Sequence, residues 1–110
     1  MLGTDLREKQ LGIVGFGRIG RAVAVKAAAF GMRVAFSSRT PISSPLGEAM
    51  PLDRLLSTSD VVTLHCPLTA DTRHLINQPT LARMKRSAYL VNASRGPVVD
   101  EAALVWALEN

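Results

Sequence analysis

The glycine-rich segment Gly15–Gly20, which reads GFGRIG, constrains the fold of this chain more than any other feature. It follows the run 11–15, which is apolar on both faces, as is typical of a strand buried inside a parallel sheet. After it, apolar residues recur at three- and four-residue steps, at Ile19, Val23, Ala27 and Phe30. This spacing predicts a helix that runs through about residue 30 and is followed by Gly31 at its C′ position. A G-x-G-x-x-G between a strand and a helix predicts a dinucleotide-binding βαβ unit.

Each glycine of this motif has its own expected task. Gly15 allows the tight turn, Gly17 lets the backbone approach a pyrophosphate, and Gly20 lets helix and strand pack closely. The anion is then expected on the free N–H groups at the positive end of the helix dipole. A glycine-rich turn without a ligand is the alternative, and the strand and helix on either side of the motif argue against it.

Short apolar runs and helical patterns alternate along the rest of the chain. This alternation predicts an α/β domain of three layers, with a doubly wound parallel sheet of the Rossmann type. The further strands are expected at 33–37, 61–65 and 88–92, with a short edge strand near 49–50. The further helices are expected at 53–58 and 80–84, followed by a closing helix capped by Asp100. Because the direction of winding reverses after the second unit, the strands should follow the spatial order Val34, Ile13, Val62, Leu90, with the segment near Met50 outermost beside Val34.

The end of the second strand is where such domains distinguish their cofactors. An acidic residue there would bond the 2′-hydroxyl of NAD, but the range 36–40 contains no carboxylate. Ser38 and Thr40 are able to donate hydrogen bonds, and Arg39 adds a cation suited to a phosphate. The segment therefore favours NADP, with NAD as the second possibility. The alternative for Arg39 is a solvated loop residue.

Composition limits the remaining classes of function. The chain has 110 residues, enough for one domain, and no apolar stretch approaches the roughly 20 residues of a membrane span. Its net charge of +4 comes from scattered basic residues, and only 5% of residues are aromatic, so no nucleic-acid partner is expected. The single cysteine, Cys66, makes neither an internal disulfide nor a zinc site. These features indicate a cytoplasmic protein with no structural metal.

Three segments together resemble the D-isomer-specific 2-hydroxyacid dehydrogenases. They are 11–20 with its glycine motif, 61–69 (VVTLHCPLT) with Thr72, and 91–101 (VNASRGPVVDE), in the family's order and spacing. The serine, arginine and threonine at 38–40 look most like the NADP-preferring glyoxylate and hydroxypyruvate reductases of that family. The resemblance implies hydride transfer between a nicotinamide and a small 2-oxo or 2-hydroxy acid, in a homodimer.

The resemblance also implies roles for individual residues. By it, Arg18 and Ile19 hold the pyrophosphate through their backbone amides, and Arg95 is the catalytic arginine that grips the carboxylate and carbonyl of the 2-oxo acid. The other cofactor contacts that it implies lie along the adenosine and nicotinamide moieties, at Cys66, Pro67, Thr72 and Ala93. A guanidinium fork suits that substrate, because it pairs with a carboxylate and stabilises charge on the oxygen.

Other parts of the family's machinery do not match any residue here. The catalytic glutamate and the histidine proton donor come from segments beyond Asn110, and His65 reads as a core or loop histidine, with catalysis as the less favoured alternative. Residues 1–110 are therefore expected to be the dinucleotide-binding domain of a longer two-domain dehydrogenase, with a sheet truncated at its C-terminal side. The alternatives are an isolated nucleotide-binding or dimerisation module without turnover and a regulator that senses nucleotide.

Overall fold

The structure, a computed structural model, describes residues 7–38, 43–66 and 72–92. Its strands are β1 (Gln10–Val14), β2 (Arg33–Ser37), β3 (Glu48–Ala49), β4 (Val61–Leu64) and β5 (Tyr89–Asn92). Its helices are α1 (Arg18–Ala29), α2 (Leu52–Thr58) and α3 (Gln78–Arg83). The expectations for the closing helix after Asp100 lie outside the described residues, as do those for Arg39, Thr40, Pro67, Ala93 and Arg95.

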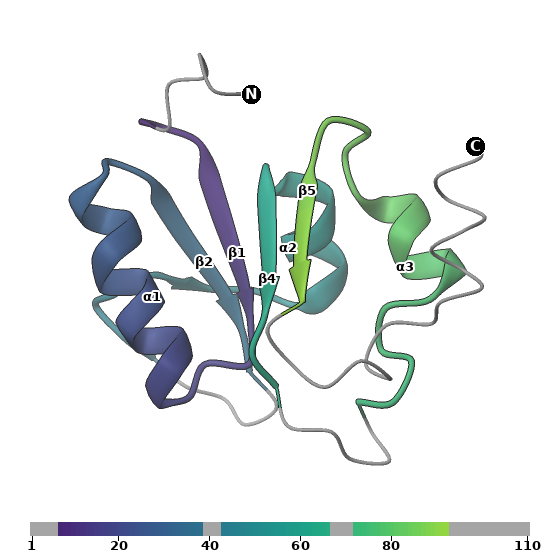
Figure 1. The fold of residues 1–110 in the computed structure, drawn as a ribbon, viewed down its shortest axis with the longest axis horizontal. Coiled ribbons are helices and arrows are strands. Elements are labelled where there is room, and N and C mark those ends of the chain that lie inside the picture. Colours follow the sequence, from purple (N-terminus) through teal and green to yellow (C-terminus); the bar gives the residue numbers. More distant parts are fainter. Residues whose placement is uncertain (1–6, 39–42, 67–71, 93–110) are drawn as a thin grey trace.

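The five strands form one parallel sheet in the order β3-β2-β1-β4-β5. This is the expected order, with the short β3 outermost beside β2. β1 lies at the centre, so the chain winds outward from it in one direction through β2 and in the other through β4 (Figure 1). The loops that follow β1 and β4 leave the sheet where the two windings part, which is where open α/β sheets bind ligands.

Each face of the sheet is covered by helices. On one face, Ile13 of β1 and Phe36 of β2 pack with Ala24 of α1. On the other, Val62 of β4 packs with Leu55 of α2, and residues of α3 lie against the same cluster. Helices on both faces of a parallel sheet make the three layers that the sequence predicts (Figure 1).

The inward face of α1 is formed by small residues. The helix buries Gly20, Ala24 and Ala27, whereas Ile19 and Phe30 are 65% and 66% exposed. Only Ala27 of this buried set belongs to the apolar stripe that predicted the helix. The physical reason is the short distance between helix and sheet, which admits small side chains and leaves the larger ones outside.

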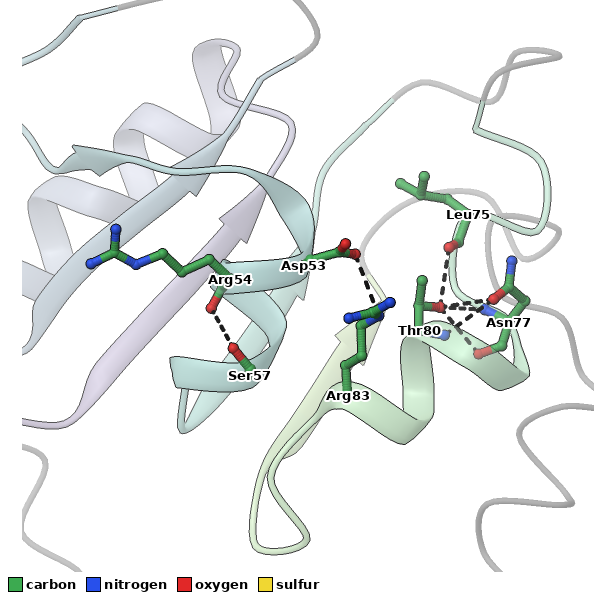
Figure 2. A network of polar contacts seen from close by, with 7 residues as sticks. All are labelled: Asp53, Arg54, Ser57, Leu75, Asn77, Thr80 and Arg83. Atoms are coloured by element: carbon green, nitrogen blue, oxygen red, sulfur yellow. Dashed lines mark hydrogen bonds and ion pairs between the residues drawn. The ribbon is translucent and has the colours of Figure 1, made fainter.

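The ends of the two short helices have local causes. Asn77 caps α3, since its side chain accepts a bond from the Thr80 N–H while Thr80 Oγ1 accepts one from the Asn77 N–H. Figure 2 shows this cap beside the ion pair between Asp53 of α2 and Arg83 of α3, whose N···O distance is 3.6 Å. The ion pair links the two helices at the surface, while their apolar residues pack on the same core cluster. Among the described residues, no helix is both long and apolar enough to cross a membrane.

Candidate cofactor-binding site

The carboxyl ends of β1, β2 and β4 are joined by backbone hydrogen bonds. The Gly15 N–H donates to the Ser37 carbonyl at 2.9 Å, and the His65 N–H donates to the Val14 carbonyl at 2.8 Å. The glycine turn after β1 is thereby held between Ser37, the last residue of β2, and His65, which follows β4. This edge of the sheet is where the sequence predicts the cofactor site.

Gly15 is the residue that the geometry of the turn demands. Its φ of +92° lies in the region that favours glycine. A Cβ at this position would lie 2.7 Å from the Cys66 backbone nitrogen, too close for a real contact. Cys66, itself buried, therefore packs directly against the turn. This places one of the expected cofactor residues, Cys66, beside the glycine motif.

Gly17 and Gly20 differ in their surroundings, although both stand in the same motif. A Cβ on Gly20 would lie 2.6 Å from the Gly15 carbonyl oxygen and 3.2 Å from Cγ2 of Ile13, so this glycine sets the approach of α1 to β1. A Cβ on Gly17 would meet no atom of the described residues within 4 Å. The space above Gly17 is open, as the approach of a diphosphate to the backbone requires.

The start of α1 has the properties of an anion site. Gly17 is the N-cap and offers no side chain to the first N–H groups, and no acidic residue stands in the first turn. The first N–H groups of a helix have no partner inside it, and the helix dipole makes this end positive. Arg18 and Ile19 begin the helix and are exposed. Their amides are therefore suited to hold phosphate oxygens.

The other residues expected at the site follow β2, β4 and β5 in the chain. Ser38 is half-buried and directly follows β2, at the position expected to read the ribose. Thr72 is buried and begins the turn that leads toward α3. Ala93 and Arg95 follow β5 in the chain, and β5 runs parallel to β4, so the chain leaves both strands at the same edge of the sheet.

His65 directly follows β4 and is held by Thr63 of that strand. Its Nε2 lies 2.8 Å from Thr63 Oγ1, and burial lowers the pKa of the imidazole from its ordinary value. Burial therefore favours the neutral form of the imidazole. This contact agrees with the interpretation of His65 as a satisfied loop histidine.

Two residues at this site were not singled out from the sequence. Phe16 lies between the first two glycines and is only 4% exposed, with its ring stacked on Phe36. Arg21 of α1 reaches back to the Phe16 carbonyl and ring. The motif treats Phe16 as a variable position, and the only signal in the sequence was a large apolar residue inside a glycine turn.

The fold and the glycine turn define a dinucleotide-binding domain of the Rossmann class. The whole range 1–110 matches the family model described as "D-isomer specific 2-hydroxyacid dehydrogenase, NAD binding domain". The chain belongs to this family, as the resemblance implied, and is an NAD(P)-binding domain.

Several known proteins are similar to the chain over nearly its whole length. It is 52% identical over 113 residues to the glyoxylate reductase of Korarchaeum cryptofilum, a match that covers 99% of this chain and 34% of that protein. Its structure resembles a glyoxylate reductase from Paecilomyes thermophila, with a TM-score of 0.89 and 44% identity over 96% of this chain and 33% of that one. An NAD-complexed D-isomer specific 2-hydroxyacid dehydrogenase from Lactobacillus delbrueckii ssp. bulgaricus gives a TM-score of 0.92 and 35% identity, over the same shares of the two chains. The chain spans about a third of the length of these relatives.

Proposed function

We propose that the protein containing these residues is an NADP-linked reductase of a small 2-oxo acid, such as glyoxylate or hydroxypyruvate. The bound nicotinamide would supply a hydride to C2, and a proton donor would supply a proton to the carbonyl oxygen. The product would be the 2-hydroxy acid, which is the D-isomer where C2 becomes a stereocentre, as it does with hydroxypyruvate. The observation that carries the proposal is the open space above Gly17 at the start of α1, in a chain that belongs to a dehydrogenase family. The similarity to proteins named glyoxylate reductase supports the choice of substrate.

This chain's own residues would bind and orient the two reactants. The amides of Arg18 and Ile19 hold the diphosphate, and Cys66, Pro67, Thr72 and Ala93 line the rest of the cofactor. The bound nicotinamide supplies the hydride. Arg95, in the segment after β5, pairs its guanidinium with the substrate carboxylate and stabilises negative charge on the carbonyl oxygen.

The proposal for Arg95 is tested in the intact protein by replacing it with lysine and with alanine. Both variants should lose most of kcat/KM, because a point charge does not reproduce the bidentate guanidinium contact. Steady-state reduction of glyoxylate and hydroxypyruvate measures the effect. An Arg95→Ala variant with wild-type kcat/KM would remove Arg95 from the reaction.

The preference for NADP rests on Ser38, Arg39 and Thr40, which stand where a carboxylate would exclude the 2′-phosphate. A hydrogen bond to a charged group contributes roughly 1.5–3 kcal/mol, so Arg39→Ala should lower the ratio of NADP to NAD affinity about tenfold or more. Ser38→Asp should shift the preference toward NAD by repulsion. Titration of both cofactors into each variant measures this ratio, and an unchanged ratio in Arg39→Ala would separate Arg39 from the phosphate.

A nucleotide-binding module without turnover is the second candidate function. The absence of a matching glutamate and histidine proton donor from residues 1–110 favours it for this chain taken alone. Residues 1–110 should bind NADPH and reduce neither acid, whereas the longer protein should do both. Turnover by residues 1–110 alone would mean that the proton donor lies among them.

We also propose a cytoplasmic homodimer. The exposed apolar residues Ile19 and Val25 of α1, together with its C-cap Phe30, support an interface on this domain. Sedimentation of the intact protein should show a dimer that Phe30→Ser weakens. A wild-type monomer at high concentration would contradict this proposal.

A further inference from the structure

The glycine turn, residues 15–17, has a single side chain to hold it in place. Gly15 and Gly17 carry none, and glycine has more backbone freedom than any other residue. A turn that presents N–H groups to a ligand binds it more tightly when its conformation is set before binding. The contacts of Phe16 therefore decide how well the turn is organised.

Phe16 ties the turn to the neighbouring strand. Its ring stacks on that of Phe36 in β2, with 4.0 Å between centroids and 11° between planes. Phe36 is buried and stands two residues before Ser38, the position expected to read the ribose. The bond from the Gly15 N–H to the Ser37 carbonyl is a second tie between the same two segments. The ring stack and the hydrogen bond thus fix the turn to the end of β2.

Arg21 holds the same turn from the helix side. Its Nε donates to the Phe16 carbonyl at 3.4 Å, and its guanidinium carbon lies 5.5 Å from the centroid of the Phe16 ring. Its backbone N–H donates to the Gly17 carbonyl at 2.9 Å. The C=O and N–H of a trans peptide point in opposite directions. Holding the Phe16 carbonyl therefore also sets the direction of the Gly17 N–H.

We propose that Phe16 and Arg21 are positioning residues for the diphosphate of the cofactor. Arg21 acts through Phe16: it fixes the carbonyl and ring of that residue, and through them the amide of Gly17. This inference rests on the proposed function, because it presupposes that the turn binds a nucleotide. It adds to the three glycines two side chains, those of Phe16 and Arg21, that set the geometry of the turn.

Arg21→Met in the intact protein is the main test. Methionine keeps an unbranched apolar stem and removes the guanidinium, and because Arg21 is exposed the core stays intact. One cation–π contact at an exposed site and one hydrogen bond support a rise of about three- to tenfold in the Kd of NADPH. The KM for NADPH should rise by a similar factor, while kcat stays within twofold, since the residue does not touch the reacting atoms.

The chain offers a matched control in Arg33. Its Nε also donates to a backbone carbonyl, that of Glu8, at 3.1 Å, but it stands at the first residue of β2, at the opposite edge of the sheet. Arg33→Met makes the same chemical change away from the turn. Its Kd for NADPH should equal that of the wild type.

Hydrogen exchange gives a readout that needs no bound nucleotide. In the ligand-free protein, the peptide covering Gly15–Gly20 should exchange its amides faster in Arg21→Met than in the wild type or Arg33→Met. Phe16→Leu keeps an apolar side chain but loses the stack and should accelerate exchange as well. Adding Arg21→Met to Phe16→Leu should have little further effect on Kd, because both residues act through the same contact.

The outcomes separate this inference from the proposed function. If the wild type binds NADPH and Arg21→Met binds it with the same Kd, the positioning role is overturned, whatever the exchange rates. If Arg33→Met weakens binding as much as Arg21→Met, the effect is a general one of lost charge and the proposal also fails. If the wild type binds no nucleotide, the proposed function fails and this inference falls with it.

Discussion

Replacing Gly20 with alanine has two opposing effects on the stability of the protein, and the structure allows their sizes to be compared. In the interior of a helix, alanine is favoured over glycine by about 1 kcal/mol. Against this, the new Cβ would lie 2.6 Å from the Gly15 carbonyl oxygen and 3.2 Å from Cγ2 of Ile13. The first of these partners is backbone, so it has no rotamer with which to avoid the contact. Either α1 or the glycine turn must shift.

The steric effect should exceed the helix propensity. Forcing a methyl group into a packed interior costs about 1–3 kcal/mol, from which the propensity gain of about 1 kcal/mol is subtracted. Gly20→Ala should therefore lower the free energy of unfolding by up to about 2 kcal/mol, and the shifted turn should bind NADPH more weakly. Urea denaturation followed by circular dichroism measures the first effect, and fluorescence titration measures the second.

Two control variants separate the effect of helix propensity on stability from the effect of a methyl group on NADPH binding. Ala22→Gly, at an exposed position of the same helix, measures the propensity term alone and should cost about 1 kcal/mol. Gly17→Ala places its methyl group in the open space, so it should change stability by less than about 1 kcal/mol, mostly through the poorer N-cap. It should nevertheless weaken NADPH binding, because the methyl group occupies the path of the diphosphate.

The reasoning would be refuted by a Gly20→Ala variant that is more stable than the wild type and binds NADPH as well. That result would mean that α1 does not approach β1 as closely in solution as the distances require. A Gly17→Ala variant with unchanged affinity would show that the open space is not where the diphosphate lies.

Two further predictions concern stability. The carboxylate of Asp60 accepts a bond from the Gln10 N–H at 2.9 Å, and this bond, with help from Lys85 and against the effect of burial, holds the pKa of Asp60 below its usual range. The stabilisation is complete above the unfolded pKa of about 4 and is lost as the pH falls through the lower folded pKa. Asp60→Asn should therefore make the free energy of unfolding fall less steeply on acidification. Equal acid-denaturation midpoints for the variant and the wild type would contradict this. Asn77→Ala removes the acceptor of the Thr80 N–H and should cost about 1 kcal/mol by urea denaturation, whereas an unchanged midpoint would mean that the cap contributes nothing.

Local patterns were sufficient to predict the architecture, and they also gave the position of the candidate site. The apolar runs at 11–15 and 61–65 predicted strands buried on both faces, because such strands have no polar side to expose. The hand of the crossover connections then allows only one spatial order once the winding reverses. The glycine spacing of Gly15–Gly20 placed the cofactor turn between strand and helix, since the steric demands of that turn are local. Arg95 was assigned by resemblance and Arg39 from its charge at the end of the second strand, and both remain predictions.

The tertiary structure decided which side of α1 is buried and what holds the glycine turn. Helical periodicity revealed a stripe containing Ile19 and Phe30, but a helix rich in alanine has a second stripe able to face a sheet. The contact of Gly20 with the Gly15 carbonyl brings the helix too close for large side chains, so the small stripe faces inward. The stack of Phe16 on Phe36 joins residues that the chain separates by a whole helix, and such a pairing exists only once the strands lie side by side.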